Sequence, residues 1–257
     1  MIIDILNLIG RSVMLACSVA GKFFVFFITT IKTLFSTKPK FSKILRQMES
    51  IGVDSLTIVM LTGTFAGAVL AFQSYIGFKR FGAVDFIGPL VALSLTRELG
   101  PVLTGLMVTG RAGSAMTAEI GTMNITEQID ALRTLCLNVY QYLIVPRMLA
   151  STIILPFLSL FTSILGIIGG YFISVYVLNL NGEQYLAGIR RYLEFSDIFN
   201  GLVKSCIFGL LLSWVGAYKG FYARGGARGV GKATTECVVV ASILILAANY
   251  FLTSLLF

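Results

Sequence analysis

The sequence predicts an all-α membrane protein, in which one N-terminal helix lies in the membrane plane and five further helices cross it. Of the 257 residues, 56% are hydrophobic and only 12% are charged, which is about half the charged fraction of a soluble domain. The mean hydropathy is +0.88. Five apolar stretches reach the roughly 20 residues that a helix needs to cross a bilayer. These observations favour a membrane-embedded fold over a soluble one.

The five predicted spans differ in the charges that they carry. The first, third and fifth carry none, the second carries only Arg97 and Glu98, and the fourth carries only Lys204. The third stretch is longer than one straight crossing needs, so we expect its ends to extend into the interfaces. The predicted spans are residues 55–78, 86–110, 148–182, 198–218 and 237–257.

The positions of Lys and Arg predict the orientation of the chain. Fourteen of these residues lie before the first span, between the second and third, or between the fourth and fifth, and four lie on the other side. By the positive-inside rule the N-terminus is cytoplasmic and, after five crossings, the C-terminus is outside. We therefore expect an interfacial helix and cytoplasmic linker over residues 1–50 and a five-span domain over residues 51–257. A cytoplasmic segment at about 111–145 would join the second and third spans.

The first 36 residues have the pattern of an amphipathic helix. At 100° per residue, their polar side chains fall within a sector of about 80° and the other faces are apolar, as in a helix lying at head-group level. Arg11 and Lys22 interrupt the apolar run, which a secretory signal would keep intact. A sixth span is the alternative, and it would place the N-terminus outside. The polar set is Asp4, Asn7, Arg11, Ser18, Lys22, Thr29, Thr33 and Ser36.

Composition and spacing exclude several chemistries. The chain has no His, so a His-ligated metal, an imidazole base and a Ser-His-Asp triad are absent. Its four Cys form no C-x-x-C pair. Residues 226–232 match the spacing of a phosphate-binding loop, but Ala233 replaces the Ser or Thr that binds magnesium and the segment lies between two spans. The net charge is +8, and the basic residues lie at the borders of the apolar runs. That placement suits binding to lipid head groups better than binding to nucleic acid.

The charged residues inside the spans are the first candidates for function. A charge at the bilayer centre costs about 2.5–3.5 kcal/mol, so Arg97 and Glu98 should face a cavity, a partner or each other. Helical spacing places Ser94, Arg97, Pro101 and Thr104 on one stripe. The pair then either lines a cavity or forms an internal salt bridge that orients helices.

Two further features of the spans concern the backbone and a lysine. Gly100 and Pro101 can kink the second span and free a carbonyl group. Lys204, one to two turns into the fourth span, either extends to the head groups or lines a cavity. Small-residue pairs at Gly63 and Gly67, and at residues 166 and 170, allow close packing between helices.

The connection between the second and third spans has its own helical pattern. Asn124 and Glu127 resemble a capping arrangement, and apolar residues recur at helical spacing over 125–136, with Glu127, Asp130 and Arg133 on the opposite flank. A short amphipathic helix of this kind is either gripped by a cytoplasmic partner subunit or packed against the base of the bundle.

Three blocks carry a resemblance to a known family. Residues 93–102 (LSLTRELGPV), 110–123 (GRAGSAMTAEIGTM) and 127–132 (EQIDAL) closely resemble the MlaE family of ABC-transporter permeases, which serve phospholipid traffic in the bacterial envelope. The resemblance covers the whole chain. It implies the MlaE-type permease fold in the bacterial inner membrane, as a homodimer in which an ABC ATPase subunit grips each copy and no cofactor is bound.

The same resemblance implies partners and site residues. A periplasmic MCE-domain protein would form a ring outside, and a small STAS-domain protein would sit on the ATPase in many such systems. The lipid cavity would open outward between the two permeases, lined by the first, second and fifth spans. Lipid-cavity residues would be Ser94, Arg97, Glu98 and Lys204. ATPase-coupling residues would be Glu119, Glu127, Asp130, Leu132 and Arg133.

The resulting expectation is a permease subunit, without an ATP site of its own, that moves phospholipids between the inner membrane and the outer envelope and maintains outer-membrane lipid asymmetry. An ion-coupled secondary transporter of a small amphipathic substrate is the alternative, although Glu98 is the only carboxylate inside a predicted span and five spans cannot form equal halves. A membrane hydrolase lacks both a His and an Asp inside a span. A pure scaffold would show no dependence on lipid.

Overall fold

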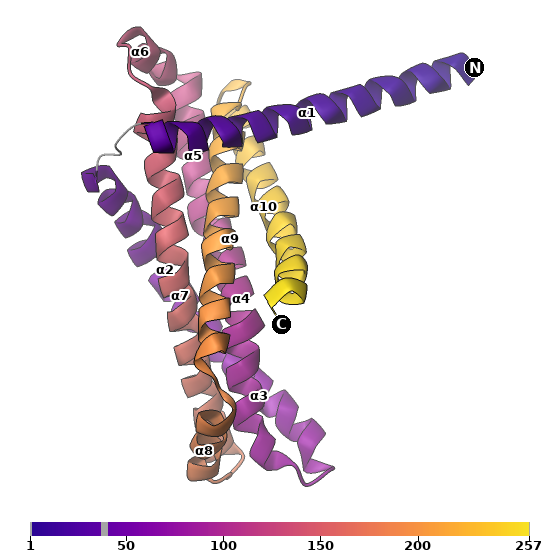
Figure 1. Cartoon of the computed structure of the whole chain (residues 1–257), viewed down its shortest axis with the longest axis vertical. Helices are drawn as coiled ribbons and strands as arrows, with labels where there is room; N and C mark the ends of the chain where they lie inside the picture. Colours follow the sequence, from indigo (N-terminus) through magenta and orange to yellow (C-terminus); the bar gives the residue numbers. More distant parts are fainter. Residues whose placement is uncertain (1, 37–40, 257) are drawn as a thin grey trace.

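A computed structural model describes residues 2–36 and 41–256, and the elements in these ranges are all helical. Five helical segments are long and apolar enough to cross a membrane, so the predicted fold class is confirmed. They pack side by side along the long axis of the molecule (Figure 1). These segments are Phe41–Lys79, Val84–Ile125, Tyr140–Val177, Phe195–Phe221 and Gly226–Leu256.

Three of these segments are single α-helices, the second is interrupted by two π-helical turns, and the third has a π-helical turn at each end. The single helices are α2 (Phe41–Lys79), α9 (Phe195–Phe221) and α10 (Gly226–Leu256). The second segment consists of η1 (Val84–Phe86), α3 (Ile87–Ser94), η2 (Leu95–Leu99), α4 (Gly100–Val108), η3 (Thr109–Gly113) and α5 (Ser114–Ile125). The third consists of η4 (Tyr140–Ile144), α7 (Val145–Phe172) and η5 (Ile173–Val177).

The close packing of α2 against α7 depends on glycine, as the small-residue spacing predicted. A Cβ atom on Gly63 would lie 2.7 Å from the backbone oxygen of Thr162, and one on Gly67 would overlap the backbone of Gly166. Backbone cannot yield as a side chain does, so only glycine fits at these crossings. The other side of α7 packs against α9, which in turn contacts α5 and α10.

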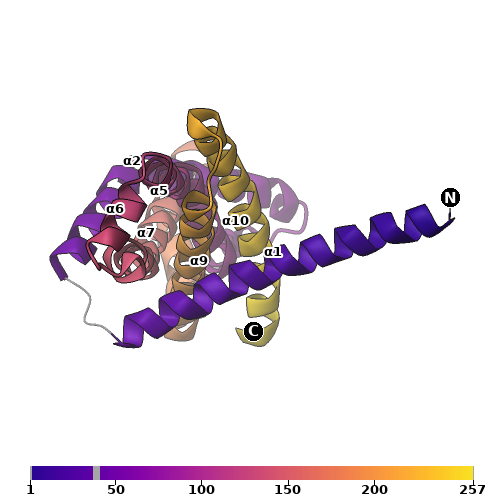
Figure 2. The same cartoon turned by 90° about the horizontal axis from the view of Figure 1, so that it is seen from above.

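Helix α1 (Ile2–Ser36) lies across the end of this bundle, and its N-terminal part extends beyond the other helices (Figures 1 and 2). Its C-terminal half is anchored by aromatic contacts. The Phe23 ring stacks on Trp214 at 4.0 Å between centroids, and Phe26, only 2% exposed, contacts Tyr140 and Phe221. This placement fits a helix at head-group level and not a sixth crossing.

The polar face predicted for α1 is only partly correct. Lys22 is exposed, but Thr33 is buried against the bundle. The Thr33 hydroxyl donates a hydrogen bond to the Thr29 carbonyl at 2.8 Å. A threonine tolerates this position because that local bond satisfies its donor. The side chains of Asp4 and Arg11, like that of residue 7, lie outside the described part of the chain.

The opposite end of the bundle is closed by α8 (Gly182–Tyr192), which packs against α3. Asn181 begins this helix by accepting a hydrogen bond from the Glu183 backbone N–H at 2.9 Å. Tyr185 is buried and donates to the Ile167 carbonyl at 3.3 Å. Burial raises the pKa of its phenol, so Tyr185 serves as a neutral anchor between α8 and the bundle.

The helices extend past the spans predicted from hydropathy. Helix α2 already includes residues 41–50 of the predicted linker, and the second segment continues to Ile125. The third begins at Tyr140 and ends at Val177 rather than covering 148–182. Hydropathy detects only the apolar centre of a helix, whereas backbone hydrogen bonding continues into its polar ends. In the segment 111–145, only α6 (Gln128–Thr134) forms a separate helix.

Candidate functional site

The carboxylate of Glu98 is the centre of a polar cluster inside the bundle. Its Oε1 accepts hydrogen bonds from Lys204 Nζ at 2.8 Å and from Thr253 Oγ1 at 2.9 Å. Its Oε2 accepts one from Asn249 Nδ2 at 2.9 Å. The cluster therefore joins the second, fourth and fifth predicted spans through one ionised group. Burial without partners would make such a charge very costly, and this set of donors offsets that cost.

Lys204 is the fully buried member of the cluster. Its side chain has no exposed surface, and its ammonium group also donates to Thr253 Oγ1 at 2.8 Å and to the Arg97 carbonyl at 3.0 Å. The lysine therefore does not extend to the head groups, which was one of the two interpretations of its position. It holds three acceptors, which matches the three donors of an ammonium group.

The Arg97 carbonyl is available because of the local helix geometry. Leu95–Leu99 form a π-helical turn, and Pro101 follows directly. Proline has no backbone N–H to return to the carbonyl one turn earlier. The freed oxygen accepts from Lys204 instead. The prediction that Gly100 and Pro101 would free a carbonyl is thus confirmed: the freed group is the Arg97 carbonyl, and the donor that it binds is the Lys204 ammonium group.

Arg97 itself points to a different partner. Its Nε and Nη2 atoms each lie 2.7 Å from Asp197 Oδ1. Asp197 is buried and its Oδ2 accepts from the Glu194 backbone N–H at 3.1 Å, completing a capping box at the start of α9. Arg97 and Glu98 therefore form two separate ion pairs with α9 rather than one with each other.

The predicted polar stripe on the second span is wrong in part. The π-helical turn inserts an extra residue into the helical repeat, so positions before and after it no longer share a face. Thr104 forms a 2.6 Å hydrogen bond with Thr162. Ser94 is half-buried, and no hydrogen bond joins it to Glu98 or Lys204 in the described part of the chain.

Three members of this site escaped the sequence analysis: Asp197, Asn249 and Thr253. Asp197 lies one residue before the predicted start of the fourth span, so it was counted as outside. The pairing of Glu194 with Asp197 three positions later is a capping signal that would have placed it on the helix. Asn249 and Thr253 are four residues apart in an uncharged span, and this spacing places both on one face.

The surface beside the cluster is apolar. Both Glu98 and Arg97 are about one-third exposed, at 34% and 39% of their side chains. Only 11% of the most apolar part of α10 is buried, against 50% for α9. Helix α10 therefore presents an exposed apolar face near the charged residues Arg97 and Glu98. Its exposed residues are Val239, Ile243, Leu246, Tyr250, Phe251 and Leu255.

The predicted coupling helix exists, but it is shorter than expected. Asn124 does not cap it, because Asn124 belongs to α5 and donates to the Ala223 carbonyl at 2.9 Å. Glu127 starts α6 in a left-handed conformation, with φ of 59°. Ile129 points inward and is buried, whereas Glu127 and Asp130 are exposed at the tip of the bundle (Figure 1).

The predicted coupling residues divide into two groups. Arg133 pairs with Asp130 at 2.8 Å on the outside of α6, and Leu132 packs partly inward. Glu119 lies on α5, away from α6, and pairs with the buried Arg147 at 2.8 Å. The structure therefore brings Glu127, Asp130, Leu132 and Arg133 together and separates Glu119 from them.

Comparison with known proteins identifies this architecture. The family model described as "Permease MlaE" matches residues 44–255, which cover all five long helical segments apart from short ends. The chain belongs to the MlaE permease family. As such it is a multi-pass permease of an ABC transporter. The family resemblance inferred from the three sequence blocks is confirmed.

Relatives of this MlaE-family chain occur in bacteria and in a plant. A Rickettsia bellii protein named "Probable ABC transporter permease protein" is 48% identical over 100% of this chain and 99% of its own length. The Haemophilus influenzae "Intermembrane phospholipid transport system permease protein MlaE" is 38% identical over 84% of each chain. Arabidopsis thaliana "Protein TRIGALACTOSYLDIACYLGLYCEROL 1, chloroplastic" is 38% identical over 83% of this chain and 61% of its own.

The glycine-rich motif of this MlaE-family chain has a structural explanation. Gly225 and Gly226 adopt positive φ angles of 93° and 66°, and Gly226 begins α10. The segment thus turns the chain from α9 into α10, and the rest of the motif is the first part of a helix. A phosphate loop would follow a β-strand instead.

Proposed function

We propose that this chain is the permease subunit of an ATP-driven transporter that moves phospholipids between the inner membrane and the outer envelope and so maintains outer-membrane lipid asymmetry. The name of the Haemophilus influenzae relative supports the substrate class. The polar cluster around Glu98 supports the site. Few groups inside a bundle are charged, and those that are tend to mark a substrate path.

A homodimer would complete the cavity. Helices α2 and α10 both carry long exposed apolar faces, and an apolar enclosure between two copies suits acyl chains. Arg97 and Glu98 would lie at the wall of that enclosure, and the Arg97 guanidinium, 39% exposed beside its Asp197 partner, would be the group that contacts a lipid phosphate. Lys204 would act indirectly, because it is fully buried and its ammonium group fixes Glu98.

Energy would come from a separate ABC ATPase subunit that grips α6. The exposed side of α6 carries Glu127, Asp130 and Arg133, while Ile129 and Leu132 attach the helix to the bundle. A pull on α6 would reach the membrane segment through the continuous helical stretch that ends at Ile125. The dimer would narrow and expel its lipid toward a periplasmic MCE-domain ring. A STAS-domain subunit on the ATPase fits the same arrangement.

The proposal places the end with α1 and α6 in the cytoplasm and the C-terminus in the periplasm of the inner membrane, as the distribution of Lys and Arg predicts. Cysteine labelling of intact cells tests this orientation. A cysteine introduced near Leu256 should react with a membrane-impermeant reagent, and one on α6 should not. The reverse pattern would overturn the orientation.

Reconstitution with the ATPase subunit tests the function. We expect ATP-dependent transfer of a fluorescent phospholipid out of proteoliposomes. A Glu98→Gln, Lys204→Met double variant should assemble normally but transfer lipid more slowly. An unchanged rate of lipid transfer in this variant would show that the cluster around Glu98 is not part of the transport site. Transfer that needs an ion gradient and no ATP would instead support a secondary transporter.

A further inference from the structure

A second polar cavity lies at the α1 end of the bundle, away from Glu98. It has a volume of about 440 Å³ and opens between the start of α2, helix α5 and the start of α7. Lys43, Arg46, Gln47 and Ser50 of α2 line one wall, and their spacing of three, four and seven residues places them on one helix face. Of the predicted coupling residues, Glu119 lines this cavity, and the predicted lipid site around Glu98 lies elsewhere in the bundle.

Arg147 lines the cavity, and one of its hydrogen-bond donors is not satisfied. Its side chain is only 4% exposed. Nη1 donates to the Leu143 carbonyl at 3.1 Å and Nη2 contacts Glu119 at 2.8 Å. The Nε atom is buried and has no hydrogen-bond partner among the residues that the structure describes. An unmade bond to a buried donor costs about 1–3 kcal/mol, so an acceptor that enters beside Arg147 gains that energy.

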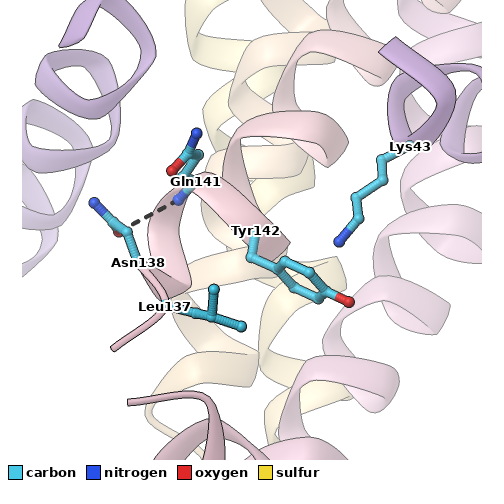
Figure 3. Close-up of a pocket in the computed structure, with 5 residues that line it drawn as sticks. All are labelled: Lys43, Leu137, Asn138, Gln141 and Tyr142. Carbon is cyan, nitrogen blue, oxygen red and sulfur yellow. Dashed lines mark hydrogen bonds between the residues drawn. The ribbon is translucent and has the colours of Figure 1, made fainter. Parts of the chain in front are cut away.

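The charged side chains that line the cavity favour binding of an anion. Lys43, Arg46 and Arg147 are cationic, and Glu119 is the anionic lining residue, so the lining has an excess of positive charge. The Lys43 ammonium group lies over the ring of Tyr142, as Figure 3 shows from the side of a smaller adjoining pocket. This cation–π contact holds Lys43 at the mouth of both cavities. The guanidinium of Arg147 keeps its positive charge at any physiological pH, and its Nε–H is the donor that an anion's oxygen would satisfy.

The surroundings favour a lipid over a soluble anion. The cavity is lined by the start of α2, by α5 and by the start of α7, and these segments lie toward the end of the bundle that α1 crosses (Figure 1), the level expected for head groups. On α2, the exposed apolar side chain of Val53 follows Ser50 of the polar wall by three residues, so it lies on a neighbouring part of the helix surface. A free phosphate would gain nothing from this side chain, whereas the acyl chains of a lipid would cover it.

We propose that this cavity binds the phosphate group of an anionic phospholipid in the leaflet on the α1 side. The site goes beyond the proposed transport cavity, because the two lie toward different ends of the bundle. Its occupant would contact Arg147, and Arg147 holds Glu119 on the helix that leads to α6. Lipid bound here would thus rigidify the base of the coupling segment.

Native mass spectrometry of the full-length protein tests this site. The protein is released from nanodiscs that contain equal amounts of phosphatidylglycerol and phosphatidylcholine, and the lipids that remain bound are counted. A Lys43→Gln, Arg46→Gln variant should retain phosphatidylglycerol roughly 25-fold less well, because each cation near an anionic head group is worth about 1 kcal/mol. Arg46 is exposed and Lys43 is half-buried, and thermal unfolding of the variant in detergent verifies that the fold is kept.

A matched variant and a competitor complete the experiment. Arg190→Gln, Arg191→Gln removes two exposed cations from α8 at the opposite end and should leave retention unchanged. Arg147→Lys keeps the charge but removes the Nε–H donor, so lipid retention should fall in that variant too. Equal retention in the Lys43, Arg46 variant, or equal loss in the α8 variant, would overturn the proposal. Displacement of the lipid by inorganic phosphate at millimolar concentration would overturn the choice of a lipid.

Discussion

The ammonium group of Lys204 donates a hydrogen bond to the backbone carbonyl of Arg97, at 3.0 Å. The bond links a buried charge on α9 to an irregular turn of the second span. Pro101 makes this carbonyl available, and Glu98, the next residue after Arg97, provides the countercharge at 2.8 Å. One lysine therefore satisfies both the unusual backbone and the buried carboxylate, and neither would be stable without it.

The first prediction concerns the Lys204 and Glu98 pair. Lys204→Met should destabilise the protein by about 3 kcal/mol, because it leaves the Glu98 carboxylate without its countercharge. Adding Glu98→Gln should restore a large part of that loss, since the remaining amide is neutral. Thermal unfolding of the three variants in detergent gives the coupling energy. Additive effects of the two substitutions would contradict the pairing.

The second prediction concerns the crossing of α2 and α7. Gly67→Ala should cost about 1–3 kcal/mol, because its Cβ would meet the backbone of Gly166. Gly77→Ala is the control on the same helix, since nothing lies within 4 Å of its Cβ position. That change should be neutral or stabilise by about 0.5–1 kcal/mol. Equal melting temperatures for the two variants would mean that the helices can separate without cost.

Sequence reasoning reached the fold because the relevant physics is local. Twenty apolar residues in a row specify a crossing whatever their neighbours are. It reached Arg97, Glu98 and Lys204 for the same reason, since each is a charge in an apolar run. The ends of the helices were harder to predict. Residues 111–125 continue the second helical segment, although their composition resembles that of a loop.

The partners of those charges could not be predicted. Which cation meets Glu98 depends on how η2, α9 and α10 pack, and the sequence separations of 106 and 151 residues to Lys204 and Asn249 give no local signal. The π-helical turn at Leu95–Leu99 also shifted the register of Ser94 and Thr104. A stripe drawn with an unbroken period of 3.6 residues cannot anticipate an inserted residue.

The third prediction concerns the anchor of α1. Phe26→Ala should cost about 3–5 kcal/mol, because this ring is 2% exposed and contacts Tyr140 and Phe221. The detached helix should then be cut by trypsin at Lys22 or Lys32. Phe35→Ala is the control, since Phe35 is 85% exposed and its loss leaves the anchor intact. Identical protection of both variants would show that lipid, not the bundle, holds α1.

The fourth prediction concerns α6 and the ATPase subunit. Glu127→Ala, Asp130→Ala removes two exposed carboxylates from the tip of the bundle. Interface charges contribute mainly to association rate and specificity, so the ATPase should bind more slowly and lipid-stimulated ATP hydrolysis should fall, while the isolated permease melts as before. Asp85→Ala, Glu183→Ala removes two exposed carboxylates from the opposite end and should change neither quantity. Surface plasmon resonance with immobilised ATPase measures the association rate. If the α6 variant has the association rate and the lipid-stimulated ATP hydrolysis of the native chain, the ATPase subunit binds another surface of the permease. The exposed face of α6 then serves only solubility.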